Sequence, residues 1–107
     1  MSSKDINNNH LRGLIIKDFN LEEDQFDNVS ADLQDIKKRL IQVLDYMLTK
    51  DFERLLNAMY RLDINETLFR DVIEGQKGNN ISELLADLII DRELQKVQTR
   101  LKYKDKI

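Results

Sequence analysis

The sequence has no cysteine, no proline and only three glycines. Without cysteine the chain can form no disulfide framework, no thiolate metal site and no cysteine nucleophile, and it suits a reducing compartment. Without proline, and nearly without glycine, it contains few of the residues that break helices. Leu, Ile, Glu, Lys, Arg and Gln are used heavily instead. This composition predicts an all-α fold.

Long apolar segments are also missing. The richest one, residues 84–90, is interrupted by Asp87 and is far too short to span a bilayer. The first ten residues carry no apolar region behind a basic start, so they do not resemble a signal peptide. With 41% hydrophobic and 35% charged residues among 107, we expect one globular domain in the cytoplasm.

Charge is distributed unevenly along the chain. Residues 1–35 carry 3 basic and 8 acidic side chains (net −5), residues 36–91 carry 8 and 10 (net −2), and residues 92–107 carry 6 and 2 (net +4). In one interpretation each end simply suits its own helix dipole and its solvated surface. In the other, the two ends lie near each other, within one chain or across a dimer.

Apolar periodicity predicts four helices with short connections, at about residues 31–50, 51–62, 66–74 and 80–102. The first is the clearest, because its apolar residues recur at spacings of three and four and Ser30 precedes it as a possible N-cap. Asp63 to Asn65 reads as a tight turn, with Asn65 capping the third helix. Gly75 is placed for a left-handed C′ position, and Asn80 for the cap of the last helix.

The N-terminal third is less regular. We expect residues 1–10 to be a disordered tail, because they are polar and rich in asparagine. Residues 11–29 form an arm across the helices, and the pattern leaves open whether it is strand, short helix or coil. The predicted architecture is a four-helix bundle-like single domain, residues 11–107, with a partly disordered N-terminal arm.

The last helix has two opposed apolar faces. On a helical wheel its first half places the apolar residues around Leu85, whereas the second half places them on the opposite side. One bundle can cover only one of these faces. The second could be covered by the N-terminal arm, turned inward by a helix break near Asp91, or covered by a second copy of the chain. We expect the second copy, and the predicted interface consists of Ile90, Leu94, Val97 and Leu101, with Arg100 and Lys102 at its rim.

Candidate chemical sites are weak. His10, the only histidine, lies in the predicted tail and cannot be a positioned base or metal ligand there. Glu83, Asp87 and Asp91 recur at helical spacing but lack the second motif of a magnesium site, so we interpret them as a solvated face eased by Arg92 and Lys77. The aromatic residues Tyr46, Tyr60 and Phe69 have apolar neighbours and are expected in the core.

Two features suggest nucleic acid without supporting it strongly. Residues 51–74 have the outline of a helix-turn-helix, but the second helix is acidic and would repel phosphates. The one basic region is the C-terminal set of Arg92, Lys96, Arg100, Lys102, Lys104 and Lys106, which also suits a helix C-terminus. The sequence therefore predicts a non-enzymatic protein–protein interaction or assembly module, a homodimer or one that binds another protein, with no cofactor and no metal. The alternative is a nucleic-acid-associated regulator that uses the basic C-terminal helix.

Overall fold

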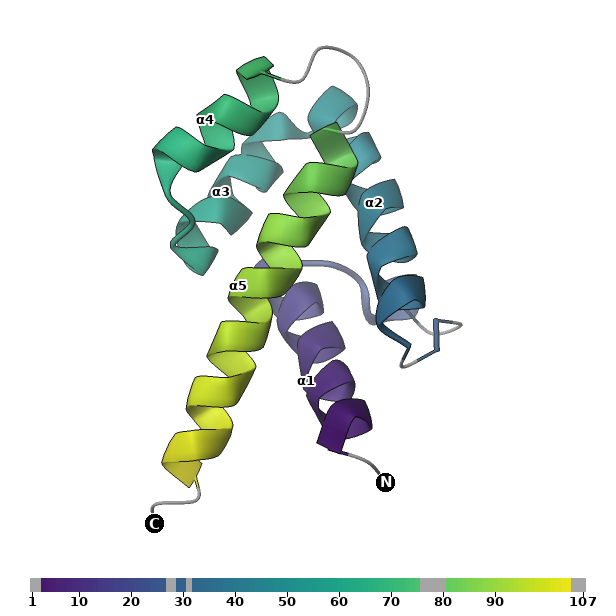
Figure 1. Ribbon diagram of the computed structural model, residues 1–107. Coiled ribbons are helices and arrows are strands. Elements are labelled where there is room, and N and C mark those ends of the chain that lie inside the picture. The colour runs from purple at the N-terminus through teal and green to yellow at the C-terminus, as the bar shows by residue number, and fades with distance from the viewer. Residues whose placement is uncertain (1–2, 27–28, 31, 76–80, 105–107) are drawn as a thin grey trace.

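A computed structural model of the chain describes residues 3–26, 29–30, 32–75 and 81–104. Within these ranges the chain is all-helical and has no strand. The order is α1 (Ser3–Asp18), the 3-10 helix η1 (Glu23–Phe26), α2 (Leu33–Lys50), α3 (Phe52–Leu62), α4 (Glu66–Gly75) and α5 (Ile81–Lys104) (Figure 1). None of the helices in the described ranges is apolar over enough length to cross a membrane.

Side-chain caps set where the middle helices begin. The Asp32 side chain accepts the backbone N–H of Gln34 at 2.8 Å, so Asp32 is the N-cap of α2. The predicted cap, Ser30, lies two residues earlier, where its hydroxyl donates to Asp35 at 2.6 Å and accepts the Asp32 N–H at 3.1 Å. The prediction of Ser30 as the cap was wrong because a second polar residue, Asp32, lies two positions later and takes this role.

The turn between α3 and α4 agrees with the prediction. Asp63 adopts a left-handed backbone (φ 57°) and ends α3, and the Asn65 side chain accepts the N–H of Thr67 at 2.8 Å. Gly75 is itself the last residue of α4 and has no left-handed backbone, so its predicted C′ role was wrong. The predicted cap Asn80 lies outside the described residues.

The longest helix, α5, runs through the centre of the molecule without a break at Asp91. Its first half lies beside α2 and α4, and its second half lies beside α1 (Figure 1). A single core includes its buried residues Leu85, Ala86, Ile89 and Ile90 together with side chains of α1, α2 and α3. Both apolar faces of α5 are therefore packed within one chain.

The helix α1 decides among the alternatives left open for the N-terminal segment. Leu11 and Ile15 of this helix, and Phe19 directly after it, are fully buried in the core. The arm predicted at residues 11–29 is therefore helical through Asp18, and residues 3–10, predicted as a disordered tail, continue the same helix. A bundle of four helices is not confirmed. Packing on α5 supplies stability that a polar sequence with poor helix propensity lacks on its own.

Gly13 offers a direct way to strengthen α1. It is an exposed glycine in the interior of the helix, and a Cβ added there would have no atom within 4 Å. Gly13→Ala should raise the free energy of unfolding by about 0.5–1 kcal/mol, because alanine leaves fewer conformations to the unfolded chain. Urea unfolding followed by circular dichroism measures this change. A destabilised variant would contradict the position of Gly13 inside a regular helix.

Candidate functional site

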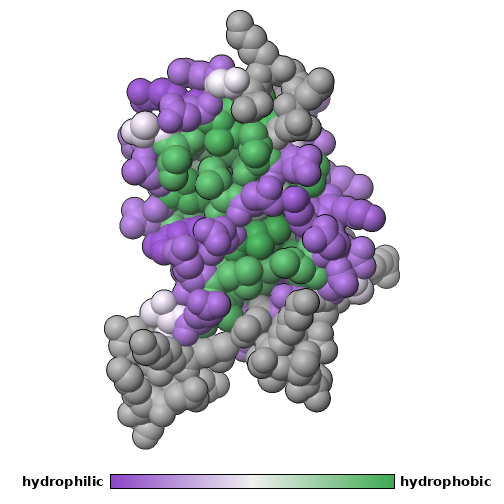
Figure 2. All heavy atoms as spheres, viewed as in Figure 1, coloured by the Kyte–Doolittle hydropathy of each residue, from purple (hydrophilic) through white to green (hydrophobic). Residues whose placement is uncertain are grey.

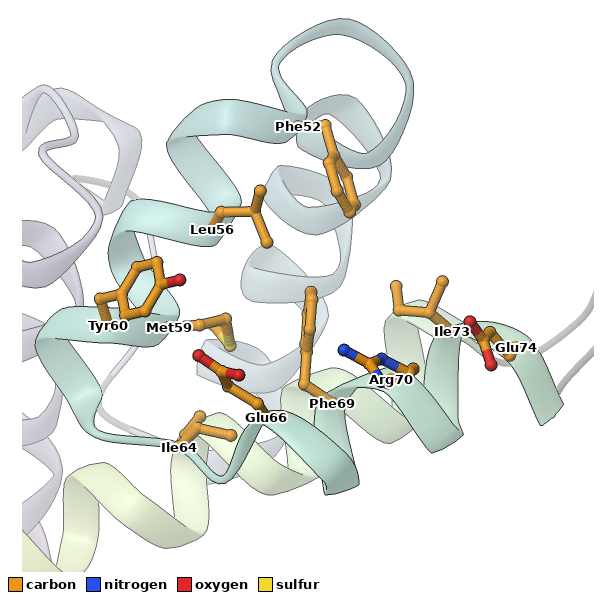
Figure 3. A pocket seen from close by; sticks show the side chains of 10 residues that line it. All are labelled: Phe52, Leu56, Met59, Tyr60, Ile64, Glu66, Phe69, Arg70, Ile73 and Glu74. Carbon is orange, nitrogen blue, oxygen red and sulfur yellow. The ribbon is translucent and has the colours of Figure 1, made fainter.

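The clearest surface feature is a groove between α3 and α4. It encloses about 290 Å³ and opens to solvent (Figure 3). The groove, called the α3–α4 groove below, is lined by Phe52, Leu56, Met59, Tyr60, Ile64, Glu66, Phe69, Arg70, Ile73 and Glu74. It arises because the short turn after α3 brings α4 back alongside it, and none of the other described helices lines the groove.

Apolar side chains line the groove and are only partly covered. Although α4 contributes Phe69 and Ile73, not one residue of this helix is buried. Opposite them on α3, the ring of Phe52 lies 6.4 Å from that of Phe69 and is 41% exposed, and Tyr60 is 70% exposed. The prediction of Tyr60 as a core residue was wrong, as was that of Tyr46, which is exposed on α2. Exposed apolar side chains that line a concave surface commonly mark a binding site.

The rim of the groove is charged. Glu66, Arg70 and Glu74 follow one another at single-turn intervals along α4, and none of them forms an ion pair with the described residues. Residues 51–75 carry six acidic and three basic side chains, a net charge of −3. Two of the three basic residues are engaged elsewhere: Arg54 pairs with Asp51 at 3.6 Å, and Arg61 donates to the backbone of α1. The groove's own rim carries Glu66 and Glu74 against Arg70 and is therefore acidic by one charge.

The adjoining face of the molecule is also apolar. Figure 2 shows hydrophobic side chains gathered over α4 and the neighbouring half of α5, with a band of hydrophilic side chains below them. On α4 Leu68 is half exposed and Val72 is partly buried, and on α5 Leu88 is partly buried. This apolar face makes α4 the least covered helix of the fold, since its two sides border exposed apolar surface.

The residues of the predicted interface on α5 differ in their exposure to solvent. Ile90 is 7% exposed and Val97 is 2% exposed, while Leu94 is partly buried. The helix α1 lies along this half of α5, and Ile90 and Val97 are already buried within the single chain (Figure 1). The side chains of Arg100, Leu101 and Lys102 lie outside the described residues, although the helix itself continues to Lys104.

A buried acidic pair lies where α1 meets α5. Glu93 of α5 is 0% exposed, and its carboxyl oxygens have no hydrogen-bond partner among the described residues. The Lys96 ammonium lies 3.7 Å from Glu93 and 3.1 Å from the buried carboxylate of Asp18, the last residue of α1. Burial and, after it, the neighbouring Asp18 carboxyl group raise the pKa of Glu93 to about 8, although Lys96 lowers it. At neutral pH the Glu93 carboxyl group is therefore mostly protonated.

Sequence reasoning did not single out Glu93, although a signal was present. Glu93 follows Ile89 by one helical turn and precedes Val97 by one turn. Both of these apolar neighbours are buried, which places the carboxyl group between the two apolar faces of α5. The position of a charged residue within such a row could have predicted its burial.

The other charged candidates are engaged in ordinary surface contacts. Lys37 of α2 pairs with Asp87 at 2.8 Å and with Glu83 at 3.8 Å, and the hydrogen bond to Asp87 raises the pKa of Lys37. Lys37 therefore neutralises Glu83 and Asp87, a role for which the sequence had suggested Arg92 and Lys77. Lys77 lies outside the described residues. His10 is exposed on α1. Within the described ranges no group of three or more histidine, aspartate or glutamate side chains is arranged to hold a metal ion.

The described part of the basic C-terminal region is used within the chain. Arg92 donates to the backbone carbonyl of Leu62 at 2.8 Å, and Lys96 bonds to Asp18. These contacts tie α5 to α3 and α1. Comparisons with protein-family models, curated proteins and solved structures give no match to this chain.

Proposed function

We propose that this chain is a non-enzymatic assembly module in which the α3–α4 groove of one copy binds the basic C-terminal segment of a second copy. The observation that carries the proposal is the state of α4. Of its four large apolar side chains, Leu68 is half exposed and the other three are only partly buried against the core, so none of its residues is fully covered. An amphipathic helix gains most of its stability from packing, so a second surface over α4 would supply burial that the single chain does not.

Charge complementarity favours a second copy as the partner. The segment that forms the groove, residues 51–75, has a net charge of −3, and residues 92–107 have a net charge of +4. Its basic residues Arg100 and Lys102 flank Leu101, so one segment supplies both an apolar side chain and cations. An acidic rim around an apolar groove suits such a segment, because the charges steer the encounter while apolar contacts hold it.

The arrangement of the helices makes this contact intermolecular. The C-terminal end of α5 and the α3–α4 hairpin lie at opposite ends of the molecule (Figure 1). The C-terminal segment of one copy would therefore reach the groove of the next, which makes the interface heterologous. Such an interface generates a ring where the rotation closes and an open chain of copies where it does not.

The test is the solution mass measured by light scattering behind size-exclusion chromatography over a range of concentrations. We expect masses above 12.7 kDa that rise with concentration and fall with added salt. Reversing the rim charge with Glu66→Lys and Glu74→Lys should weaken association roughly tenfold or more, as should Arg100→Glu with Lys102→Glu in the other component. A monomer at every concentration would overturn the proposal.

A mixing experiment distinguishes this interface from any other. Each doubly reversed variant lacks one half of the contact, but a mixture of the two retains one intact groove and one intact basic segment. Because the reversed groove and the reversed segment are also complementary in charge, we expect association to return in the mixture, while each variant alone is monomeric. The matched control is Glu22→Lys with Asp24→Lys, which changes the charge equally at exposed residues outside the groove. If this control weakened association as strongly, the effect would be one of net charge alone.

A further inference from the structure

The junction between α1 and α5 contains an arrangement that packing alone does not explain. Glu93 is fully buried within an otherwise apolar row, yet its carboxyl oxygens find no hydrogen-bond partner among the described residues. A buried, unsatisfied carboxyl group is unfavourable, and an ionised one is far more so. A Leu or Met at this position would bury the same surface without that cost.

The charged groups around Glu93 come from each helix at the junction. From α1, the Asp18 carboxylate is buried at the helix C-terminus, where the helix dipole disfavours a negative charge. On α5 itself, Lys96 lies within 4 Å of both carboxyl groups. From α3, Arg61 donates to the Asp18 backbone carbonyl at 3.1 Å. One ammonium group thus serves two carboxyl groups, while the Arg61 guanidinium is bonded to a backbone carbonyl, so ionisation of Glu93 adds a second carboxylate beside Lys96.

We infer that Glu93 is a pH-sensitive latch that holds α1 on α5 while its carboxyl group is protonated and loosens α1 when the group ionises. Ionisation leaves two carboxylates against Lys96 in a site closed to water, and separation of α1 from α5 relieves this by hydrating Glu93 and Asp18. The raised pKa of Glu93 places the change near neutral and mildly alkaline pH. This inference does not depend on the proposed function.

Release of α1 would change the surface of the molecule. The residues it covers on α5 include Ile90 and Val97, which are nearly inaccessible while α1 is in place. They belong to the apolar stripe whose spacing predicted an interface. The latch therefore controls access to a second apolar surface, separate from the α3–α4 groove.

Native-state amide hydrogen exchange tests the latch, with rates corrected for the intrinsic pH dependence of exchange. The pKa of Glu93 is about 8 in the closed state against an ordinary value of 4.5, so the opening constant of α1 should rise about tenfold per pH unit between these values. We expect this slope for the protected amides of residues 11–19. The amides of α2 should remain protected over the same range, because opening of α1 is local.

Two variants make the outcome decisive. Glu93→Gln removes the ionisable group at nearly constant shape, and the slope for α1 should disappear. Asp18→Asn removes the second carboxylate and should lower the pKa of Glu93 in the closed state. The pH above which α1 opening stops rising should then be lower, while Glu93 remains able to titrate. The latch is overturned if α1 opening in the unmodified chain does not vary with pH, or varies equally in Glu93→Gln. It is also overturned if α2 exchanges through the same opening as α1.

Discussion

The free energy of unfolding should fall as the pH rises from about 5 to about 8. Glu93 has a pKa near 8 in the folded chain against an ordinary value of 4.5, so the folded state holds a proton that the unfolded state releases. Stability is therefore fully present below the lower value and is lost as the pH rises through the upper one. With about 1.4 kcal/mol per pH unit, the loss reaches at most roughly 4–5 kcal/mol. This is a large part of the stability of a small domain.

Urea unfolding curves at a series of pH values, followed by circular dichroism, measure this loss. Glu93→Gln should flatten the dependence and leave the chain more stable than the unmodified protein at pH 9. Glu83→Gln is the matched control, because it neutralises an exposed glutamate of the same helix. The pKa of Lys37 is raised above 10.5, so its contribution to stability is constant below that pH and is lost only above it. Lys37 therefore does not mask the effect of Glu93. Equal stability of the unmodified chain at pH 5 and pH 8 would contradict the burial of a Glu93 carboxyl group that lacks a hydrogen-bond partner among the described residues.

The parts of the fold that local chemistry determines could be predicted from the sequence. The core stripe of α2 has strict helical spacing, and the turn before α4 uses residues suited to a left-handed backbone and a cap. The boundaries of the predicted helices from residue 31 onward therefore agree with α2 to α5 within two residues. These signals depend on neighbours in sequence, which is why they are readable without a structure.

The parts that depend on distant contacts could not be predicted in the same way. The helix α1 begins in a polar segment whose intrinsic propensity is poor, and its stability comes from burial on α5, far away in sequence. The second apolar face of α5 was recognised, but the residues that cover it belong to the segment left open as strand, helix or coil. Patterning shows that a face must be covered, and it does not show by which surface.

The candidate sites also combine features set by neighbours in sequence with features set by distant contacts. The acidic character of residues 51–75 is readable from sequence, but the groove exists only because no helix lies across α3 and α4. The expectation that Tyr60 lies in the core failed for this reason. Glu93 could have been noticed from its place between Ile89 and Val97, whereas its proximity to Asp18 depends on the packing of α1.

Phe19→Ala should destabilise the chain by about 3–5 kcal/mol. Phe19 follows α1 directly, is fully buried, and belongs to the same core as residues of α2, α3 and α5. Removing its ring loses the transfer free energy of the side chain and leaves a cavity that the surrounding helices fill only partly. The loss is measured from the midpoint of urea unfolding, with the slope of the transition as a check that the unfolding remains two-state.

Phe52→Ala is the matched control for this prediction, because it makes the same substitution at a ring that is 41% exposed on the α3–α4 groove. Its cost should be well below that of Phe19→Ala, since less apolar surface leaves contact with the protein. If the two substitutions cost the same, the segment around Phe19 would be a loosely held arm and not part of the core. A large difference would instead show that the folded state depends on the packing of α1. The release of α1 from α5 would then need a free energy comparable to that of ionising a buried carboxyl group.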